Sequence, residues 1–378
     1  MHKFKSLFYC CIAATCIFLC FIPLMGLKFN DKVVSSLPAI EEDSFEYLRA
    51  GFEQPGKAYA GVPFWIWHDK VTRESIDSML LDYKKNGFGG VIVHQRPGMI
   101  TEYLSQDWFE LFQYTVKKGK ELDLDIWIYD ENSYPTGFGG GHVPAEMPES
   151  YNQGSMLRMT KANLPVLDKG EIFIALRKDA DGSFTNITET FKSEESKPGE
   201  YYLFHKEYYE RSDWFAGYSY VDLMVKGVTE KFIDVTMTGY EKTMSNEFGK
   251  TIKGLFSDEP SIQAYGAAGC IRWTPDLFNT FQQKWGYDLQ AQLPSLFEET
   301  GDWRRVRHNY FQTLLDLFVD RWFKLMHVYT QKNNLVWTGH YWEHAWPEPM
   351  YGPDNVASYA WHDQRGVDMV WNQFDESS

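Results

Sequence analysis

The sequence is poor in cysteine and in positive charge, and both shortages limit what the protein can be. Four of its five cysteines, Cys10, Cys11, Cys16 and Cys20, lie close to the N-terminus, so Cys270 is left without a partner for an internal disulfide. Stability must therefore come from a packed core. There are 52 acidic against 37 basic side chains, a net charge of −15. This balance argues against nucleic-acid binding, because phosphates require a basic surface.

Common motifs for nucleotide and zinc chemistry are also missing. The glycine-rich stretch at residues 137–141 is not a phosphate loop, because it has no G-K-[ST]. There is no H-E-x-x-H, and His68 stands alone where a zinc hydrolase would need an H-x-H pair. A hard cation held by Asp and Glu oxygens is compatible with the sequence. We keep a metal-dependent hydrolase of amides or esters as a further alternative.

The N-terminus has the composition of a targeting segment. Lys3 and Lys5 precede an apolar run over residues 7–27 that carries no charge and is long enough to cross a bilayer. We predict a signal peptide or membrane anchor over residues 1–27 and a linker over 28–58. The protein is then exported to a bacterial periplasm, outer membrane or cell exterior, and only the first segment meets a membrane.

From residue 59 onwards, short apolar runs alternate with amphipathic segments. Short buried runs indicate the strands of a parallel sheet, and an apolar stripe every three or four residues indicates the helices between them. Strands are expected at residues 62–67, 90–94, 124–129, 252–256, 335–338 and 366–371, and helices at 43–51, 72–86, 106–120, 229–248, 275–285 and 302–332.

The predicted fold class is α/β, of the (β/α)8 TIM-barrel type, because repeated strand–helix units with right-handed crossovers can close into a barrel. Period-2 runs interrupt this order and predict a small β insertion after the third strand, at residues 150–213. The barrel is then formed by residues 59–149 and 214–378. With about six predicted strands, it would be truncated before closure.

Polar side chains follow the predicted strands. Asp258 and Glu259 are the sharpest example, because burial and a neighbouring carboxylate both raise a carboxyl pKa, as a general acid requires. Asp130 and Glu131 occupy the equivalent place after the third strand, next to a glycine-rich stretch. Aromatic residues make up 17% of the chain, which suits stacking on the apolar faces of sugar rings, although most single rings are expected in the core.

The order of these motifs resembles that of exported bacterial glycoside hydrolases of family 106 type, the α-L-rhamnosidases and their relatives. The resemblance covers roughly residues 59–369 and implies a (β/α)8 catalytic domain, an inverting carboxylate mechanism and a calcium ion near the sugar. It rests on residues 64–67 (FWIW), 89–96 (GGVIVHQR), 103–109 (YLSQDWF), 127–131 (WIYDE), 256–260 (FSDEP) and 338–340 (TGH).

Members of that family are longer than this chain. They continue beyond the segment that resembles residues 366–370 to further strands with another acidic residue, whereas this sequence ends at Ser378. We therefore expect the N-terminal part of such an enzyme. The alternative is a truncated, non-catalytic fragment or a weak carbohydrate-binding protein.

Hydrolysis of a glycosidic bond requires two carboxyl groups, one on each side of the bond. We predict that Glu259 is the acid and Glu343 the base, with Glu131 as a third candidate. The substrate class is plant or microbial polysaccharide side chains, with an α-L-rhamnoside as one candidate. Predicted substrate contacts come from His68, His94, Arg96, Asp130, Asp258 and His340, and stacking contacts from Trp67 and Trp342.

Overall fold

Two five-stranded sheets, one parallel and one antiparallel, organise the larger of the two units into which the chain divides. The computed structural model describes residues 45–53, 55–147, 154–163, 172–191, 197–262, 269–342 and 352–369. The smaller unit, Met1–Gly56, is represented among these by helix α2 (Phe45–Glu53), close to the predicted 43–51. The predicted targeting segment lies outside the described residues. Within them, no helix is long and apolar enough to cross a membrane.

The larger unit, Lys57–Ser378, contains the parallel sheet, with strand order β1-β2-β3-β8-β10. All four pairings are parallel, and each strand lies within a few residues of its predicted position. The prediction of an α/β fold with a parallel sheet is confirmed. The strands are β1 (Phe64–Trp67), β2 (Gly90–Gln95), β3 (Asp125–Tyr129), β8 (Ile252–Asp258) and β10 (Val336–His340).

The predicted sixth strand is not a strand where the structure describes it. Residues 366–369 have no regular secondary structure, and residues 370–371 lie outside the described part. The segment still follows the edge of β10, since the amides of Asp363 and Gln364 donate to the Trp337 carbonyl at 3.0 and 3.1 Å. A Cβ on Gly366 would lie 2.5 Å from the Gly339 carbonyl oxygen, so the two backbones are close.

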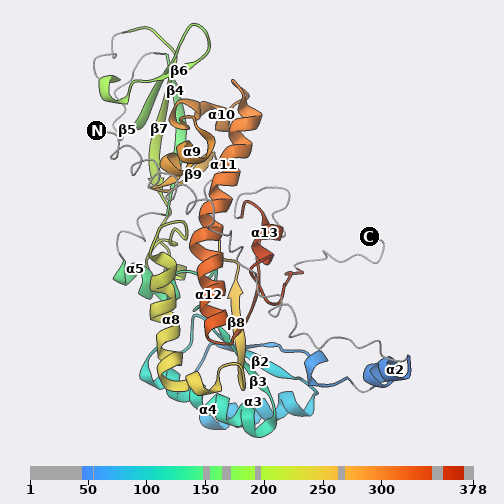
Figure 1. Cartoon of the computed structure of the whole chain (residues 1–378). Coiled ribbons are helices and arrows are strands. Elements are labelled where there is room, and N and C mark those ends of the chain that lie inside the picture. Colours follow the sequence, from blue (N-terminus) through green and yellow to red (C-terminus); the bar gives the residue numbers. More distant parts are fainter. Residues whose placement is uncertain are drawn as a thin grey trace, which may run out of the picture. The chain divides into compact units, whose positions relative to one another are not determined.

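Helices pack on one face of the parallel sheet. Helix α3 begins at a capping box, in which the Thr72 hydroxyl accepts from the Ser75 amide and the Ser75 hydroxyl accepts from the Thr72 amide. Helices α3 and α4 lie under β2 and β3, and α8 and α12 stand beside β8 (Figure 1). Their bounds are α3 (Arg73–Lys85), α4 (Gln106–Leu122), α8 (Val228–Met244), α11 (Trp303–Phe318) and α12 (Lys324–Lys332).

The predicted helix over residues 302–332 is continuous but contains one irregular turn. A π-helical turn, η7 (Val319–Phe323), joins α11 to α12. At this turn Arg321 donates to the Met224 carbonyl and pairs with Asp276, with Nη2 2.7 Å from Oδ2. Further short helices are η1 (Lys57–Tyr59), η2 (Gly139–Gly141), α5 (His142–Glu146), η4 (Asp213–Phe215), η5 (Ser245–Glu247) and α13 (Asn355–Tyr359).

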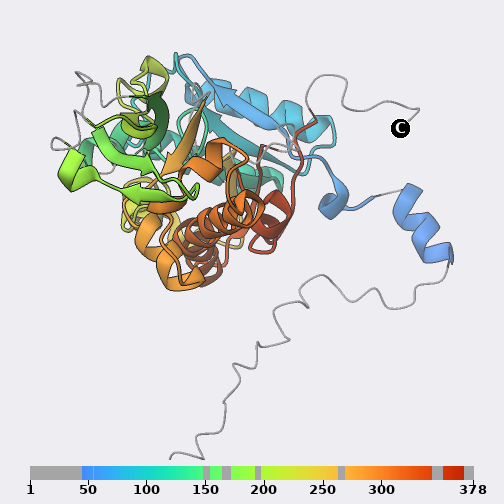
Figure 2. The same ribbon diagram turned by 90° about the horizontal axis from the view of Figure 1, so that it is seen from above.

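The antiparallel sheet has the order β6-β5-β7-β4-β9. Four of its strands come from the predicted insertion, β4 (Ser155–Ala162), β5 (Ile172–Lys178), β6 (Phe184–Asn186) and β7 (Tyr201–Tyr208). The fifth, β9 (Cys270–Trp273), comes from beyond β8 and pairs with β4. Both views place this sheet beside the segment that contains α9 (Leu277–Trp285), η6 (Gln290–Gln292) and α10 (Pro294–Phe297) (Figures 1 and 2). The short helix η3 (Thr188–Thr190) lies between β6 and β7.

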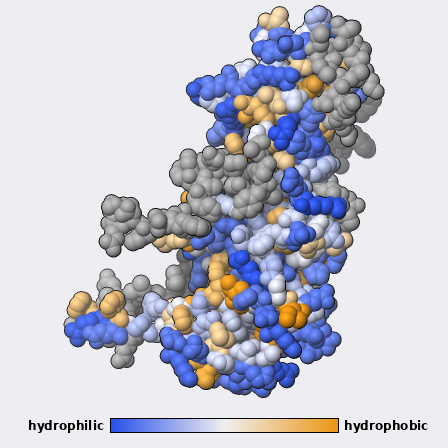
Figure 3. All heavy atoms as spheres, turned by 180° about the vertical axis from the view of Figure 1, so that it is seen from behind, coloured by the Kyte–Doolittle hydropathy of each residue, from blue (hydrophilic) through white to orange (hydrophobic). Residues whose placement is uncertain are grey.

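The two faces of the parallel sheet have different surroundings. Alternate residues such as Trp65 and Trp67 point towards the helices and join the main core. The opposite face carries a smaller cluster that includes Tyr129, and Phe64 on this face is 42% exposed. The face of the molecule seen in Figure 3 is largely hydrophilic with scattered apolar groups. The face of the sheet that carries Phe64 is therefore partly open to solvent.

Candidate active site

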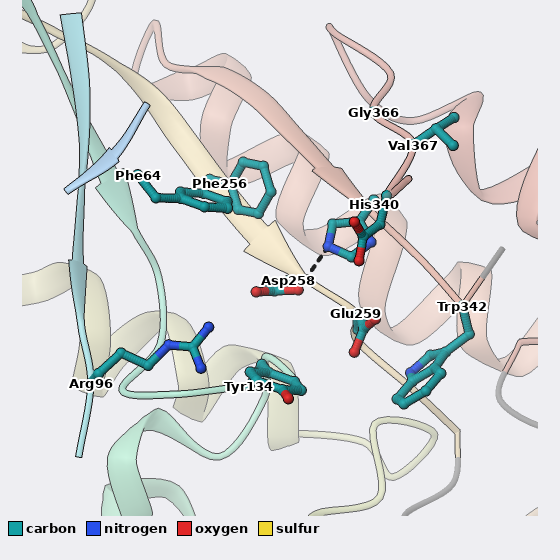
Figure 4. Close-up of a pocket in the computed structure, with 11 residues that line it drawn as sticks. Phe64, Arg96, Tyr134, Phe256, Asp258, Glu259, His340, Trp342, Gly366 and Val367 are labelled. Carbon is teal, nitrogen blue, oxygen red and sulfur yellow. Dashed lines mark ion pairs between the residues drawn. The ribbon is translucent and has the colours of Figure 1, made fainter. Parts of the chain in front are cut away.

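A pocket of about 500 Å³ lies at the carboxyl ends of β8 and β10 (Figure 4). This is the end of a parallel sheet at which ligands bind in α/β folds. Its walls combine aromatic rings, carboxylates and one guanidinium. The lining residues are Phe64, Arg96, Tyr134, Phe256, Asp258, Glu259, His340, Trp342, Gly366, Val367 and Asp368.

Asp258, the last residue of β8, is held by two neighbouring side chains. Oδ1 lies 2.9 Å from Nε2 of His340, the last residue of β10, and Oδ2 accepts from the Tyr129 hydroxyl. Burial raises the pKa of Asp258, but His340 and Tyr129 lower it more, and the result is below the ordinary value. The predicted rise therefore does not hold for Asp258, which remains ionised.

The approach of His340 to Asp258 depends on a glycine. Gly339 has a φ of 153°, and a Cβ there would lie 2.0 Å from the Ser257 carbonyl oxygen. Only glycine allows the two strands to approach this closely without a shift of the backbone. The Thr-Gly-His sequence at the end of β10 thus has a structural reason as well as a chemical one.

Glu259 is in a backbone conformation that side-chain-bearing residues rarely adopt, with a φ of 47°. Its amide donates to the His340 carbonyl at 3.1 Å, which ties the turn after β8 to the end of β10. The side chain is 5% exposed and lies in the pocket beside Asp258 and His340 (Figure 4). Strained backbone of this kind is concentrated at functional sites.

Arg96 and Tyr134 form a different wall of the same pocket. The Arg96 Nε donates to Nε2 of His94 at 3.0 Å, and its Cζ lies 5.0 Å from the centre of the Tyr134 ring. Burial and the Arg96 charge lower the pKa of His94 to about 3 against the opposing effect of Asp258, so this ring is neutral. It stacks on Tyr129 at 3.5 Å between ring centres.

The structure gives Asp130 and Glu131 surroundings outside the pocket lining. Asp130 is buried and accepts from the hydroxyls of Thr136 and Ser257, and burial raises its pKa well above the ordinary value. Glu131 is fully buried, and burial raises its pKa to about 7 although backbone hydrogen bonds oppose the rise. Its carboxylate accepts from the amides of Asn132, Gly137, Phe138, Gly139 and Gly140 at 2.5 to 3.1 Å. Glu131 thus organises the glycine-rich loop and is not among the residues that line this pocket.

The other predicted residues divide between pocket, core and surface. Trp342 lines the pocket, whereas Trp67 is 1% exposed and packs against Trp108 in the core, with 5.2 Å between ring centres. The Trp67 side chain therefore lies in the core and does not line the pocket. His68 is exposed and does not line the pocket. Glu343, the predicted base, lies outside the described residues and directly follows Trp342.

Three aromatic residues of the pocket were missing from the sequence-based set. Phe64 and Phe256 pack edge to face at 4.9 Å between ring centres, on the same face of the sheet as Tyr129. Tyr134 is held by Trp214, whose indole N–H donates to the Tyr134 carbonyl. The alternation of side chains along a strand could have identified Phe64, because Trp65 and Trp67 on the same strand point to one face and Phe64 must point to the other. No local pattern marks Tyr134.

The described residues fit a calcium ion poorly. Asp258, Glu259 and His340 can place one ligand atom each within 4.8 Å of one another. However, both Asp258 oxygens already have protein partners, and His340 offers nitrogen, whereas calcium takes six to eight oxygens. The calcium ion implied by the resemblance therefore remains a prediction, and no chemistry is derived from it.

Fold and pocket together define a mixed α/β protein with a carboxylate-bearing, aromatic-walled pocket at the carboxyl ends of a parallel sheet. No family model matches the chain, and no curated protein matches it. Among solved structures it is similar to a rhamnosidase from Novosphingobium sp. PP1Y, with a TM-score of 0.56 and 12% identity. The match covers 84% of this chain and 49% of the rhamnosidase, so the chain spans about half of that protein. At this identity the likeness shows that the two chains share a fold.

Proposed function

We propose that this chain carries the glycosidic-bond-cleaving pocket of an exported bacterial glycoside hydrolase, with α-L-rhamnosides as one candidate substrate class. The observation that carries the proposal is Glu259, a carboxyl group on strained backbone in a pocket with aromatic walls. The similarity in fold to a rhamnosidase and the order of the sequence motifs support it.

In the proposed reaction, water is added across the glycosidic bond. The Glu259 carboxyl gives its proton to the oxygen that leaves with one sugar, and a second carboxylate assists attack on the anomeric carbon. We assign the second role to Glu343, as predicted from the sequence. Asp258 is less suited, because His340 and Tyr129 occupy its two oxygens. Trp342 and Tyr134 provide faces on which a sugar ring can stack.

Glu259→Gln tests the assignment, because glutamine keeps the shape of the side chain but cannot donate the proton as an acid. On an oligosaccharide we expect kcat to fall by about 10²–10⁴-fold, the usual contribution of general acid catalysis. The fall should be much smaller on a 4-nitrophenyl glycoside of the same sugar, whose leaving group departs without protonation. Both substrates are assayed by initial rates with the full chain.

Glu110→Gln on the exposed surface of α4 is the matched control and should leave both rates unchanged. Equal losses on the two substrates would contradict an acid role for Glu259. Absence of hydrolysis by the wild-type chain, together with aggregation on heating, would favour the truncated, non-catalytic fragment instead.

A further inference from the structure

The guanidinium of Arg96 is held by two neighbouring side chains that carry no negative charge. Its Nε donates to His94, and its Cζ lies 5.0 Å from the centre of the Tyr134 ring. In the described part of the chain, Arg96 forms no ion pair with an Asp or Glu side chain. Figure 4 shows the group directed into the pocket, on the side of Asp258 away from Glu259. A positive charge fixed in this way is available to a ligand.

One edge of the Arg96 guanidinium is already used for hydrogen bonding. Guanidinium N–H groups point outward in the plane of the group. The Nε edge is used by neutral His94, which accepts at Nε2 and is itself fixed by stacking on Tyr129. In the described part of the chain the two Nη atoms make no hydrogen bond, so their N–H groups remain for a ligand in the pocket. A guanidinium edge matches the two oxygens of a carboxylate.

The simpler interpretation is that Arg96 only balances the carboxylates nearby. In that case, however, Arg96 would be expected to pair with Asp258, which lines the same pocket and carries a charge. Asp258 instead pairs with His340 at 2.9 Å and accepts from Tyr129. The arrangement thus keeps the Arg96 guanidinium apart from the Asp258 carboxylate within one pocket. This separation is what a ligand with both a scissile bond and an anionic group requires.

We infer that the pocket recognises an acidic saccharide, and that Arg96 binds the carboxylate of a uronic acid residue in the substrate. This inference rests on the proposed function and adds the chemical class of the substrate to it. His94 and Tyr134 act as positioning residues for the guanidinium. A sugar acid bound in this way would place its ring between Arg96 and the Glu259 side of the pocket.

Binding measured by calorimetry on the full chain tests the inference. The probes are glucuronate and galacturonate, their methyl esters, and glucose and galactose. For at least one uronate, we expect wild-type affinity about tenfold or more above that for its ester, the scale of a charge-assisted bidentate contact. Arg96→Gln should abolish this difference, and Arg96→Lys should restore it only in part, because lysine keeps the charge without the planar edge.

Arg73→Gln is the matched control, since Arg73 also lies over a tyrosine ring, that of Tyr114, but outside the pocket. It should bind all probes like the wild type, and thermal melting should show that every variant is folded. Equal wild-type affinity for acid and ester, or a preference retained by Arg96→Gln, would overturn the inference. Tighter binding of a sulfated sugar than of either uronate would overturn the carboxylate assignment.

The outcome is separable from that of the proposed function. If hydrolysis depends on Glu259 but Arg96→Gln changes the rate on no glycoside, the proposed glycosidase function stands and the inference of an acidic substrate fails. If uronate binding depends on Arg96 but no glycoside is hydrolysed, the inferred uronate site stands and the proposed glycosidase function fails. Binding of no saccharide by the folded wild-type chain would overturn both.

Discussion

Asp258 and Glu131 follow buried strands in similar sequence contexts, yet their carboxylates have opposite surroundings. Asp258 meets an imidazole and a tyrosine hydroxyl, which keep its pKa below the ordinary value in spite of burial. Glu131 meets backbone amides in a fully buried site, and burial raises its pKa to about 7. At the scale of the residue, the hydrogen-bond partners of a carboxylate determine whether it lines the pocket or holds a loop in place.

Glu131→Gln should destabilise the protein by about 2–4 kcal/mol. A glutamine amide has one acceptor oxygen, so some of the five backbone N–H groups that now donate to Glu131 would be left buried and unpaired, at about 1–3 kcal/mol each. Urea unfolding measures the free energy of unfolding of this variant, with Glu110→Gln as the control. Lost turnover with wild-type stability would instead support the catalytic role that the sequence suggested for Glu131.

At the scale of the element, the packing of α4 against α8 depends on one glycine. A Cβ on Gly239 would lie 1.9 Å from Cζ of Phe109, so the Phe109 ring occupies the space a side chain would need. The same ring packs edge to face on Tyr240, with 5.1 Å between centres. Phe109 therefore cannot move without disturbing a second contact between the helices.

Gly239→Ala should lower stability by about 1–2 kcal/mol, although alanine favours a helix over glycine by about 1 kcal/mol, because overpacking costs more. Thermal melting measures the change. Gly51→Ala in α2 is the control, since its Cβ would meet no atom within 4 Å, and it should cause no loss. Combining Gly239→Ala with Phe109→Leu should recover part of the stability, and failure to recover any would argue against this contact.

At the scale of the whole molecule, a buried aspartate lies where the segments of the two sheets meet. Asp222 is 4% exposed and accepts from the Met224 amide at 2.8 Å. Burial raises its pKa to about 7, while this amide and the charges of Arg321 and Arg272 oppose the rise. Arg272 belongs to β9 of the antiparallel sheet, and Arg321 to the π-helical turn beside the parallel sheet.

Asp222→Asn should therefore change how stability depends on pH. Because the folded pKa of Asp222 is raised, the wild type binds a proton more tightly when folded, and this contribution is lost as pH rises from about 4 to about 7. Asparagine removes the titration. The variant should gain stability relative to the wild type as pH rises, on the order of 3 kcal/mol by pH 8.

Melting temperatures between pH 4.5 and 8 measure this difference. Asp213→Asn, at an exposed position, makes the same change of side chain and should melt in parallel with the wild type. A constant gap between Asp222→Asn and wild type across this range would contradict the assignment.

The positions of strands, helices and strand-end polar residues follow from the sequence because these features are local. Burial of a strand requires a short apolar run, and an amphipathic helix requires an apolar stripe, wherever the partners lie. The runs that end on Asp258 and His340 could thus be predicted to meet, since the carboxyl ends of parallel strands share one edge. The sequence could not predict that β9 joins the antiparallel sheet, because β9 pairs with β4 and the paired residues are more than a hundred positions apart.

The sequence by itself therefore determined the parallel sheet and placed Asp258, Glu259, His340 and Arg96 at its carboxyl end. Only the tertiary structure decided which side chains face the pocket and which face the core. Trp67 points to the helices, Glu131 binds a loop, and Asp258 is held by His340 and Tyr129. The physical reason is that the direction of a side chain and its bonding partners depend on contacts between distant parts of the chain, whereas hydrophobic periodicity depends only on neighbouring residues along it.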